Sequence, residues 1–296
     1  NGEHPLDAVF LSPHKFVGGP GTPGILIVKK AVVNNTIPSI VGGGTVKYVT
    51  PEDHLFTDDI ERREEGGTPA IVETIRAGLV FKLQQEVGVE EIERRERDFA
   101  SRATARFKRC PNLQIMGAQD EPGLSIMSLR FKRGGKDLHY GFVVSLLNDL
   151  FGIQVRGGCS CAGPYGHSLL AMDMDYSKAI EAEIAAGNMI MRPGWVRLNF
   201  NYFIDEQEFE YLLRAVELVA EHGWRLLPFY HYDTVAGVWS YQGERMNLPE
   251  GLDAFSFSDF SHARNEPAAA AVALDGHIEV ATKELCLENR VGHLSA

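Results

Sequence analysis

Cysteines are few in this sequence, and long apolar runs are missing from it. Only 4 of the 296 residues are Cys. That is too few for the disulfide framework of a small secreted domain, so we expect a reducing, cytoplasmic setting. No stretch approaches the ~20 apolar residues that cross a bilayer. Residues 1–4 contain neither an initiator Met nor the layout of a signal peptide, and we expect the chain to begin inside a longer protein.

Basic residues are also in short supply. Lys and Arg total 29 against 40 for Asp and Glu, which gives a formal net charge of −11. This balance repels phosphate backbones and acidic membrane surfaces, so we expect neither nucleic acid nor a membrane as a partner. The basic residues that gather in 92–109 are interleaved with acidic ones, which predicts a solvated helix face. The remaining composition is typical of a globular protein with one large domain or two moderate ones.

Strand and helix signals predict an α/β region followed by a smaller α+β region. Short apolar runs predict strands at 7–11, 24–30, 113–117, 124–132, 153–156 and 195–200. The strand at 7–11 is expected to be buried. Helical spacing predicts helices at 69–88, 89–108, 140–151 and 206–222. In the first helix Thr68 is the expected N-cap, and the apolar stripe consists of Ile71, Ile75, Leu79 and Leu83. The texture of the sequence changes near residue 110, which separates the two regions.

A strand that delivers a lysine into a glycine-rich loop is the sharpest chemical signal. Residues 7–20 read Asp-Ala-Val-Phe-Leu-Ser-Pro-His-Lys-Phe-Val-Gly-Gly-Pro, which places Lys15 directly after His14 and close after Ser12. A lysine amine forms an imine with an aldehyde only when the amine is neutral. Small neighbours let a planar cofactor approach the backbone, and Ser12 and His14 could donate hydrogen bonds to its phosphate. On the residues alone, an ordinary surface lysine after a strand explains the pattern as well.

Four more segments complete a series of motifs. They are the glycine turn at 42–45, Arg-Arg-Glu-Glu-Gly-Gly-Thr-Pro at 62–69, Val-Arg-Gly-Gly-Cys-Ser-Cys at 155–161 and Val-Arg-Leu-Asn-Phe-Asn at 196–201. With the lysine loop, they resemble in order and spacing the motifs of the class V aminotransferase and cysteine desulfurase family, whose members are fold-type I pyridoxal-phosphate enzymes. The resemblance covers roughly residues 5 to 225.

This resemblance implies an α/β fold and a cofactor. Residues 1–110 would be the rear part of the cofactor-binding large domain, 111–228 a small α+β C-terminal domain, and 229–296 an extension to which we assign no role. The cofactor would be pyridoxal 5'-phosphate, held as an internal aldimine on Lys15. The family's aspartate at the pyridine nitrogen precedes the lysine and has no counterpart among the fourteen residues before Lys15.

The resemblance also assigns the remaining cofactor contacts. Ser12 and His14 would lie at the phosphate. Gly44 and Thr45 of the glycine turn would reach the cofactor of the partner subunit, which implies a homodimer.

Two arginines and a cysteine loop would handle the substrate. The resemblance implies that Arg156 and Arg197 hold the carboxylate of a small amino acid, for which the planar guanidinium is suited. It implies that Cys161 accepts sulfur, which requires an accessible thiolate. On the residues alone, Arg197 fits an exposed salt bridge as well as a cleft. The pair Cys159 and Cys161 fits inert small residues, a reactive thiol or part of a metal site, but no further metal ligands accompany it, and we expect no metal.

These expectations combine into a reaction and two alternatives. The expected function is a cysteine desulfurase or selenocysteine lyase-like reaction, in which the amine of Lys15 moves the α-proton of the amino acid. A sulfur-acceptor protein is a candidate partner. One alternative is a class V transamination or epimerisation in which Cys161 is incidental. The other is a non-catalytic remnant that keeps the fold for dimer contacts.

Overall fold

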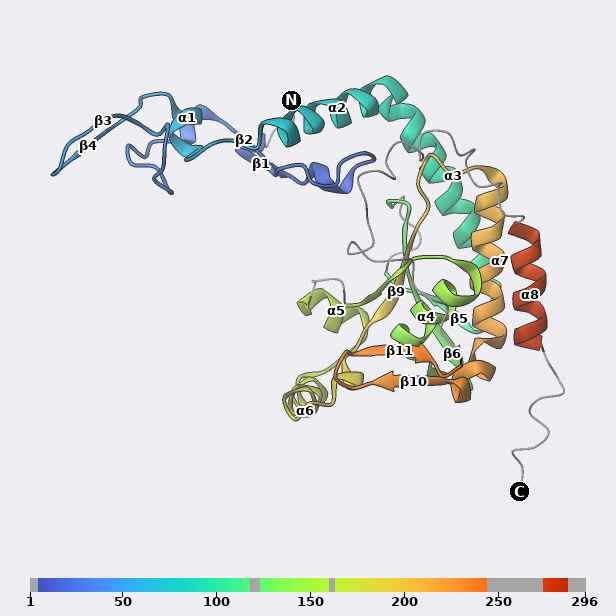
Figure 1. Cartoon of the computed structure of the whole chain (residues 1–296). Helices are drawn as coiled ribbons and strands as arrows, with labels where there is room; N and C mark the ends of the chain where they lie inside the picture. Colours follow the sequence, from blue (N-terminus) through green and yellow to red (C-terminus); the bar gives the residue numbers. More distant parts are fainter. Residues whose placement is uncertain (1–4, 118–122, 160–162, 244–273, 287–296) are drawn as a thin grey trace, which may run out of the picture. The chain divides into compact units, whose positions relative to one another are not determined.

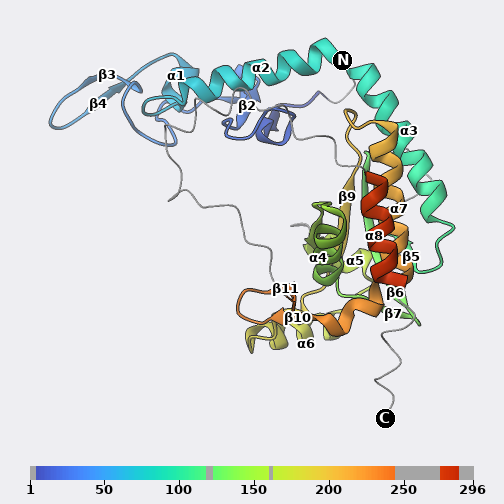
Figure 2. The ribbon, with the colours of Figure 1, turned by 45° about the vertical axis from the view of Figure 1, so that its right-hand side comes forward.

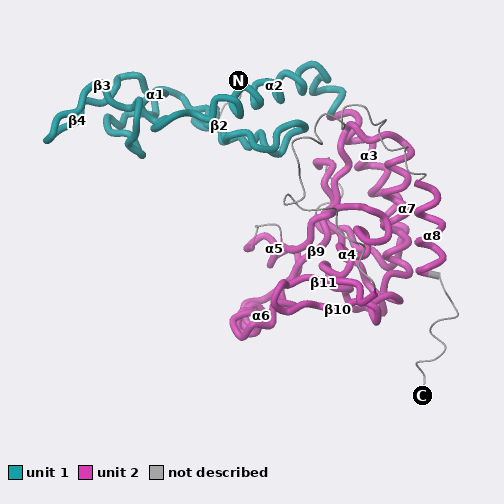
Figure 3. The backbone as a smooth tube through the Cα atoms, viewed as in Figure 1, with its two compact units in different colours: residues 1–92 teal, residues 93–296 magenta. Residues whose placement is uncertain are grey.

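Two units divide the chain, residues 1–92 and residues 93–296 (Figure 3). The computed structural model describes residues 5–117, 123–159, 163–243 and 274–286. The division between the units falls inside a helix, ahead of residue 110 where the texture of the sequence changes. Among the helices of these described ranges, none is long and apolar enough to cross a bilayer.

Unit 1 contains two separate two-stranded ribbons and one long helix (Figure 1). Its elements are β1 (Ala8–Leu11), η1 (Pro13–Lys15), β2 (Ile25–Val28), η2 (Lys30–Val32), β3 (Val46–Val49), β4 (His54–Phe56), α1 (Ile60–Glu64) and α2 (Ile71–Val87). β1 pairs with β2 and β3 pairs with β4, both antiparallel. The strands expected at 7–11 and 24–30 are confirmed, with slightly shorter bounds.

The apolar residues of unit 1 are largely exposed, which differs from the expectation of a buried first strand. Phe10 in β1 is 80% exposed and Ile27 in β2 is 58% exposed. The expected stripe of α2 is likewise 41% to 61% exposed, whereas Ala77 and Val80 are its buried residues. Apolar residues occur on more than one side of this helix, so helical spacing alone does not decide which side is buried.

The start of α2 also differs from the expected position. Ala70 is the N-cap residue, and no side chain caps this helix end. Thr68 is therefore not the cap, because the chain enters the helix two residues later. The end is as expected, since Gly88 closes the helix with a φ of 89°, which glycine adopts without strain.

Unit 2 is built around an antiparallel sheet with the order β5-β6-β9-β8. Its first elements are α3 (Val89–Phe107), which begins in unit 1, β5 (Leu113–Ile115), β6 (Ile126–Arg133), β7 (Lys136–Asp137), α4 (Tyr140–Phe151), β8 (Arg156–Gly158), α5 (Gly163–Leu169) and α6 (Met174–Ala185). Then follow η3 (Met189–Met191), β9 (Trp195–Asn199), α7 (Glu206–His222), η4 (Gly223–Phe229), β10 (Tyr230–Asp233), β11 (Val238–Tyr241) and α8 (Leu274–Cys286). β7 extends the sheet by pairing with β6.

Alternation along the central strands creates the core of unit 2. In β6, Leu129 and Phe131 are buried to 0% and 1% exposure, and in β9 the same holds for Val196 at 1%. These side chains join a cluster with Phe142 of α4 and Phe209 of α7. Full burial of one such side chain stabilises a fold by about 1.5–3 kcal/mol, so this cluster holds the sheet that carries the predicted arginines.

The strand expected at 153–156 is displaced to 156–158, and a helix cap explains the shift. Gly152 ends α4 in the left-handed region with a φ of 65°. The N–H of Ile153 then donates to the carbonyl of Leu147 at 3.0 Å. Residues 152 and 153 therefore complete the end of α4, and pairing with β9 begins only at Arg156.

The C-terminal segment is part of unit 2. The hairpin β10–β11 packs on α4, where the rings of Trp239 and Phe142 meet edge to face at 5.4 Å. Helix α8 runs beside α7 in both Figure 1 and Figure 2, and its Ile278, Ala281 and Leu285 are buried in the same core. The described parts of the extension that begins at residue 229 thus contribute to the fold.

Candidate active site

Lys15 ends a single 3₁₀ turn that follows β1. Its backbone N–H donates to the carbonyl of Ser12 at 3.0 Å, and the N–H of Phe16 donates to the carbonyl of Pro13 at 2.9 Å. Pro13 is buried, whereas His14 and Lys15 are exposed. The ring of the proline fixes the backbone at the start of the turn. The predicted trio Ser12, His14 and Lys15 is therefore gathered on one short, anchored turn.

Close backbone approach explains the glycines that follow the lysine. A Cβ at Gly19 would lie 1.9 Å from the carbonyl oxygen of Pro13, and Gly18 has a φ of +77°. No residue with a side chain fits at position 19, and one at position 18 would be strained by the positive φ. Only glycines let the loop fold back onto the turn that presents Lys15.

Helix α2 supports this loop from one side. The ring of Phe81 meets that of Phe16 edge to face at 5.5 Å. The guanidinium of Arg76 donates to the carbonyl of Pro20 at 2.9 Å. These contacts fix the loop at both ends of its glycine pair, so α2 positions the lysine turn.

The glycine turn at 42–45 has a closed side and an open side. Thr45 is completely buried, and its hydroxyl donates to the carbonyl of Gly42 at 2.7 Å. Gly43 and Gly44 are exposed, and a Cβ on either would meet nothing within 4 Å. The hydroxyl of Thr45 therefore closes the turn, while the backbone of Gly43 and Gly44 is the part that can contact a ligand.

Arg63 holds this turn region in place, a role that the sequence did not suggest. The side chain is buried, with 7% exposure. Its guanidinium donates to the carbonyls of Thr57 at 2.9 Å and Asn35 at 2.7 Å. A buried arginine that binds two carbonyls cross-links three segments of unit 1. Its only sequence signal was its place in the motif at 62–69.

In unit 2 the two predicted arginines lie directly opposite each other. Arg156 opens β8 and pairs in register with Arg197 in the middle of β9. Directly opposed residues of antiparallel strands point to the same face, with their Cβ atoms about 4.5–5.5 Å apart. Two guanidinium groups in this position can bind the same anion. The structure thus brings together two residues that are far apart in the sequence.

The cysteine loop follows β8 directly. Cys159 is a free, exposed thiol one residue after the end of the strand. Cys161, the expected sulfur acceptor, lies outside the described residues. Among the described residues no group of three or more His, Cys, Asp or Glu side chains could hold a metal ion.

An aromatic cluster, which sequence reasoning missed, borders the base of this loop. Tyr140 packs so tightly on β8 that a Cβ at Gly157 would lie 2.7 Å from its ring. His139 stacks on Tyr140 at 4.5 Å, and its Nδ1 accepts a hydrogen bond from the indole of Trp239 at 2.9 Å. Burial lowers the pKa of His139 and raises that of Tyr140. The neutral imidazole is therefore a structural acceptor here.

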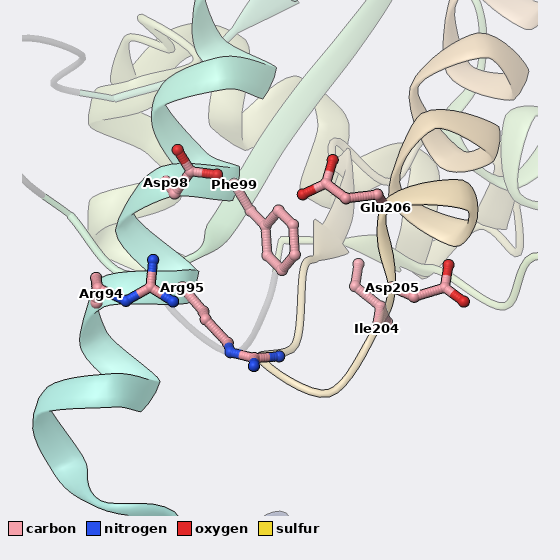
Figure 4. Close-up of a pocket in the computed structure, with 7 residues that line it drawn as sticks. All are labelled: Arg94, Arg95, Asp98, Phe99, Ile204, Asp205 and Glu206. Atoms are coloured by element: carbon pink, nitrogen blue, oxygen red, sulfur yellow. The ribbon is translucent and has the colours of Figure 1, made fainter.

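A separate hollow of about 250 Å³ lies between the starts of α3 and α7 (Figure 4). Its lining residues are Arg94, Arg95, Asp98, Phe99, Ile204, Asp205 and Glu206. The lining mixes both signs of charge, and Glu206 already pairs with Arg102 at 2.6 Å. None of the predicted site residues lines it, so this hollow is not our candidate site.

Comparisons with known proteins place the chain in a family. A sequence model described as aminotransferase class-V matches residues 3–212. The chain belongs to this family. A probable cysteine desulfurase from Halalkalibacterium halodurans is 31% identical over 158 residues, which cover 53% of this chain and 37% of the relative. A cysteine desulfurase from Escherichia coli is 29% identical over 168 residues, which cover 54% of this chain and 39% of the relative.

Solved structures of class V enzymes show the same fold. The apo structure of a cysteine desulfurase from Thermococcus onnurineus NA1 matches with a TM-score of 0.57 and 25% identity, over 73% of this chain and 47% of that one. A cysteine desulfurase from Escherichia coli matches with a TM-score of 0.56 and 22% identity. The chain thus has the fold of part of a fold-type I pyridoxal-phosphate transferase, and it spans less than half the length of these relatives.

The residues around Lys15 fit the cofactor of this family. A primary amine, a hydroxyl and an imidazole on one turn supply what an aldehyde and a phosphate need from a protein. The amine of Lys15 and the ring of His14 are exposed, so both are accessible to a ligand. The open backbone of Gly43 and Gly44 adds a surface that a phosphate can approach.

Proposed function

We propose that the protein is a pyridoxal-phosphate enzyme of the cysteine desulfurase or selenocysteine lyase type, which acts on a small amino acid. The observation that carries the proposal is the lysine turn, in which Ser12, His14 and Lys15 stand together in a class V family member. The named relatives, which are cysteine desulfurases, favour sulfur chemistry within that family.

Lys15 is the residue to which we assign both the cofactor bond and the proton transfer. Pyridoxal 5'-phosphate, when bound, supplies an electron sink for the negative charge that develops at the substrate Cα. The amine of Lys15 takes the α-proton and returns it. The hydroxyl of Ser12 and the imidazole of His14 bind the phosphate, and the short turn keeps all three groups in one place.

Arg156 and Arg197 bind the carboxylate of the amino acid in this proposal. Their register pairing on β8 and β9 presents two guanidinium groups to one anion. Both strands are tied to the core of unit 2, so the pair is pre-organised and orients the substrate without a large loss of side-chain entropy.

Cys161 is the proposed sulfur acceptor. Its thiolate would take the sulfur atom of cysteine and become a persulfide, while the three-carbon remainder leaves as alanine after protonation at Cβ. The balanced reaction converts free cysteine and the enzyme thiol into alanine and the enzyme persulfide. Arg156, five residues before Cys161 in the sequence, is a source of positive charge that would favour the thiolate form. A sulfur-acceptor protein would then remove the persulfide sulfur.

A homodimer is the proposed working unit. The glycine turn at 42–45 is exposed and open at Gly43 and Gly44, so it can reach a neighbouring subunit. The apolar stripe of α2 is exposed as well, and contiguous apolar surface is typical of association sites. A reducing, cytoplasmic setting would keep the reactive thiols free.

The first test is covalent trapping of the cofactor. We expect borohydride reduction of the protein loaded with pyridoxal phosphate, followed by peptide mass mapping, to place the adduct on Lys15. Lys29 and Lys30 directly follow the second strand of the same ribbon and serve as internal controls. An adduct on either control, or none anywhere, would contradict the assignment to Lys15. The absence of any bound cofactor would favour the non-catalytic remnant.

A further inference from the structure

Trp195 has a buried hydrogen-bond donor without a partner. The side chain is 3% exposed, and its indole Nε1 contacts no acceptor among the described residues. Buried donors that lack a partner are uncommon in native structures, and a ligand is one established explanation. The other two tryptophans differ, because Trp239 donates to His139 and Trp224 is only half-buried.

The position of Trp195 ties this donor to the two arginines. Trp195 precedes Arg197 by two residues on β9, so both side chains lie on the same face of the sheet. In the register, Gly158 lies opposite Trp195, and Arg156 lies opposite Arg197. The four positions form a square on one face of the sheet. The two arginines lie side by side along one edge, and Trp195 and Gly158 lie along the opposite edge.

A glycine occupies the fourth corner of this square. Gly158 has no side chain, and a Cβ built on it would meet nothing within 4 Å. The far edge of the indole lies near α5, because a Cβ at Gly166 would lie 3.5 Å from Cη2 of Trp195 and 3.7 Å from Cβ of Cys159. Cη2 belongs to the edge of the ring away from the N–H, so α5 lies beside the edge that carries no donor.

We propose that the indole N–H of Trp195 donates a hydrogen bond to the carboxylate that Arg156 and Arg197 bind. This inference rests on the proposed function, since it takes the arginine pair as the carboxylate site. Trp195 supplies a third donor, which a carboxylate can accept because its two oxygens offer several lone pairs. The contact satisfies the buried donor only when ligand is present, and it selects for an oxyanion over a neutral group.

The test uses propionate, a carboxylate without an amine, so that it binds without reacting at the cofactor. We expect the indole ¹H–¹⁵N resonance of Trp195 to move on titration of the full chain, while those of Trp224 and Trp239 stay in place. Trp195→Phe keeps the ring and removes the donor, and it should weaken propionate binding about tenfold. Trp224→Phe is the matched control and should bind as the wild type does.

The outcomes separate this inference from the proposed function. If propionate binds the wild type and fails with Arg197→Gln, but Trp195→Phe binds normally or the Trp195 resonance does not move, the role of Trp195 is overturned while the carboxylate site stands. If propionate does not bind the wild type, both fail. The resonance of the wild type decides the matter even where Trp195→Phe does not fold.

Discussion

At the scale of single residues, glycines decide how closely functional side chains approach the backbone. A Cβ at Gly19 would meet the carbonyl of Pro13 at 1.9 Å, and a Cβ at Gly157 would meet the ring of Tyr140 at 2.7 Å. Contacts this short do not occur for real Cβ atoms, so any larger residue would move the lysine turn or the cysteine loop. Two positions without side chains thus set the placement of Lys15 and Cys159.

The two cysteines of the loop allow a paired test of the sulfur step. Cys161→Ala should abolish alanine release from L-cysteine and persulfide formation, because it removes the proposed acceptor. Cofactor retention should stay at the wild-type level, since Lys15 does not need the thiol. Cys159→Ala, which changes the cysteine two residues earlier, should retain most of the activity.

The comparison of these variants also separates the rival reactions. Full alanine release by Cys161→Ala would contradict the desulfurase proposal and leave a class V transamination or epimerisation in its place. Loss of activity only in Cys159→Ala would move the sulfur step to that thiol.

Sequence motifs name residues but do not show their partners. Motifs alone named Lys15, Arg156 and Arg197 as candidates, and the register of β8 and β9 places the two arginines opposite each other. The unpaired indole of Trp195 and the internal hydrogen bond of Thr45 are different, because each depends on which atoms lie nearby in space. No local pattern carries that information.

At the scale of elements, α3 and α7 are joined by a row of ion pairs. Arg102 pairs with Glu206 at 2.6 Å, and Arg106 pairs with Glu217 at 2.7 Å. The hydrogen bond from Arg102 lowers the pKa of Glu206. The charged run at 92–109 is therefore a solvated face that also orients two helices. Beside these ion pairs, Phe99 packs on Phe209 at 4.6 Å.

The contact between α4 and the C-terminal hairpin should make stability depend on pH. Burial lowers the pKa of His139 in the folded chain, with a smaller opposing effect of the Ile190 carbonyl. Below the unfolded value of about 6.5 the unfolded chain takes up a proton that the folded chain does not. His139 therefore contributes stability above pH 6.5, and that contribution falls as the pH drops towards the folded pKa.

The measurement is urea unfolding at pH 7.5 and pH 5.0, followed by circular dichroism. We expect the midpoint to fall at the lower pH in the wild type and to fall less in His139→Asn, which keeps an acceptor at the N-cap of α4 but does not titrate. The groups that face His139 are the rings of Tyr140, Tyr232 and Trp239. Equal shifts in both proteins would rule out His139 as the source.

Strong amphipathic patterns predicted their elements well, and ambiguous ones did not. The bounds of α4 and α7 match the expected 140–151 and 206–222, because each helix has one apolar side and clear end signals. Helix α2 has apolar residues on several sides, so its buried side was predicted wrongly. The hairpin β10–β11 was missed because its aromatics are spaced irregularly along the sequence, although they gather on α4 in space.

At the scale of the whole molecule, the proposed homodimer makes a specific claim about which subunit completes which site. Lys15 would hold the cofactor within its own subunit, while the glycine turn would serve the cofactor of the other. Gly43 allows this claim to be tested with little strain, since a Cβ there meets nothing within 4 Å and its φ is not positive. An aspartate at this position should repel the phosphate without disturbing the buried Thr45.

A mixed dimer tests the exchange of turns between subunits. Dimers of Lys15→Ala alone or Gly43→Asp alone should retain little cofactor, and Gly43→Asn, the neutral control, should retain it at the wild-type level. In the mixed dimer, purified through two different tags, the Lys15 of the Gly43→Asp chain meets the intact turn of its partner. One site of two is then complete, and we expect about half of the wild-type cofactor per dimer. Borohydride should trap that cofactor only on the Gly43→Asp chain. Sedimentation as an active monomer, or a mixed dimer without cofactor, would show that each turn serves its own subunit or none.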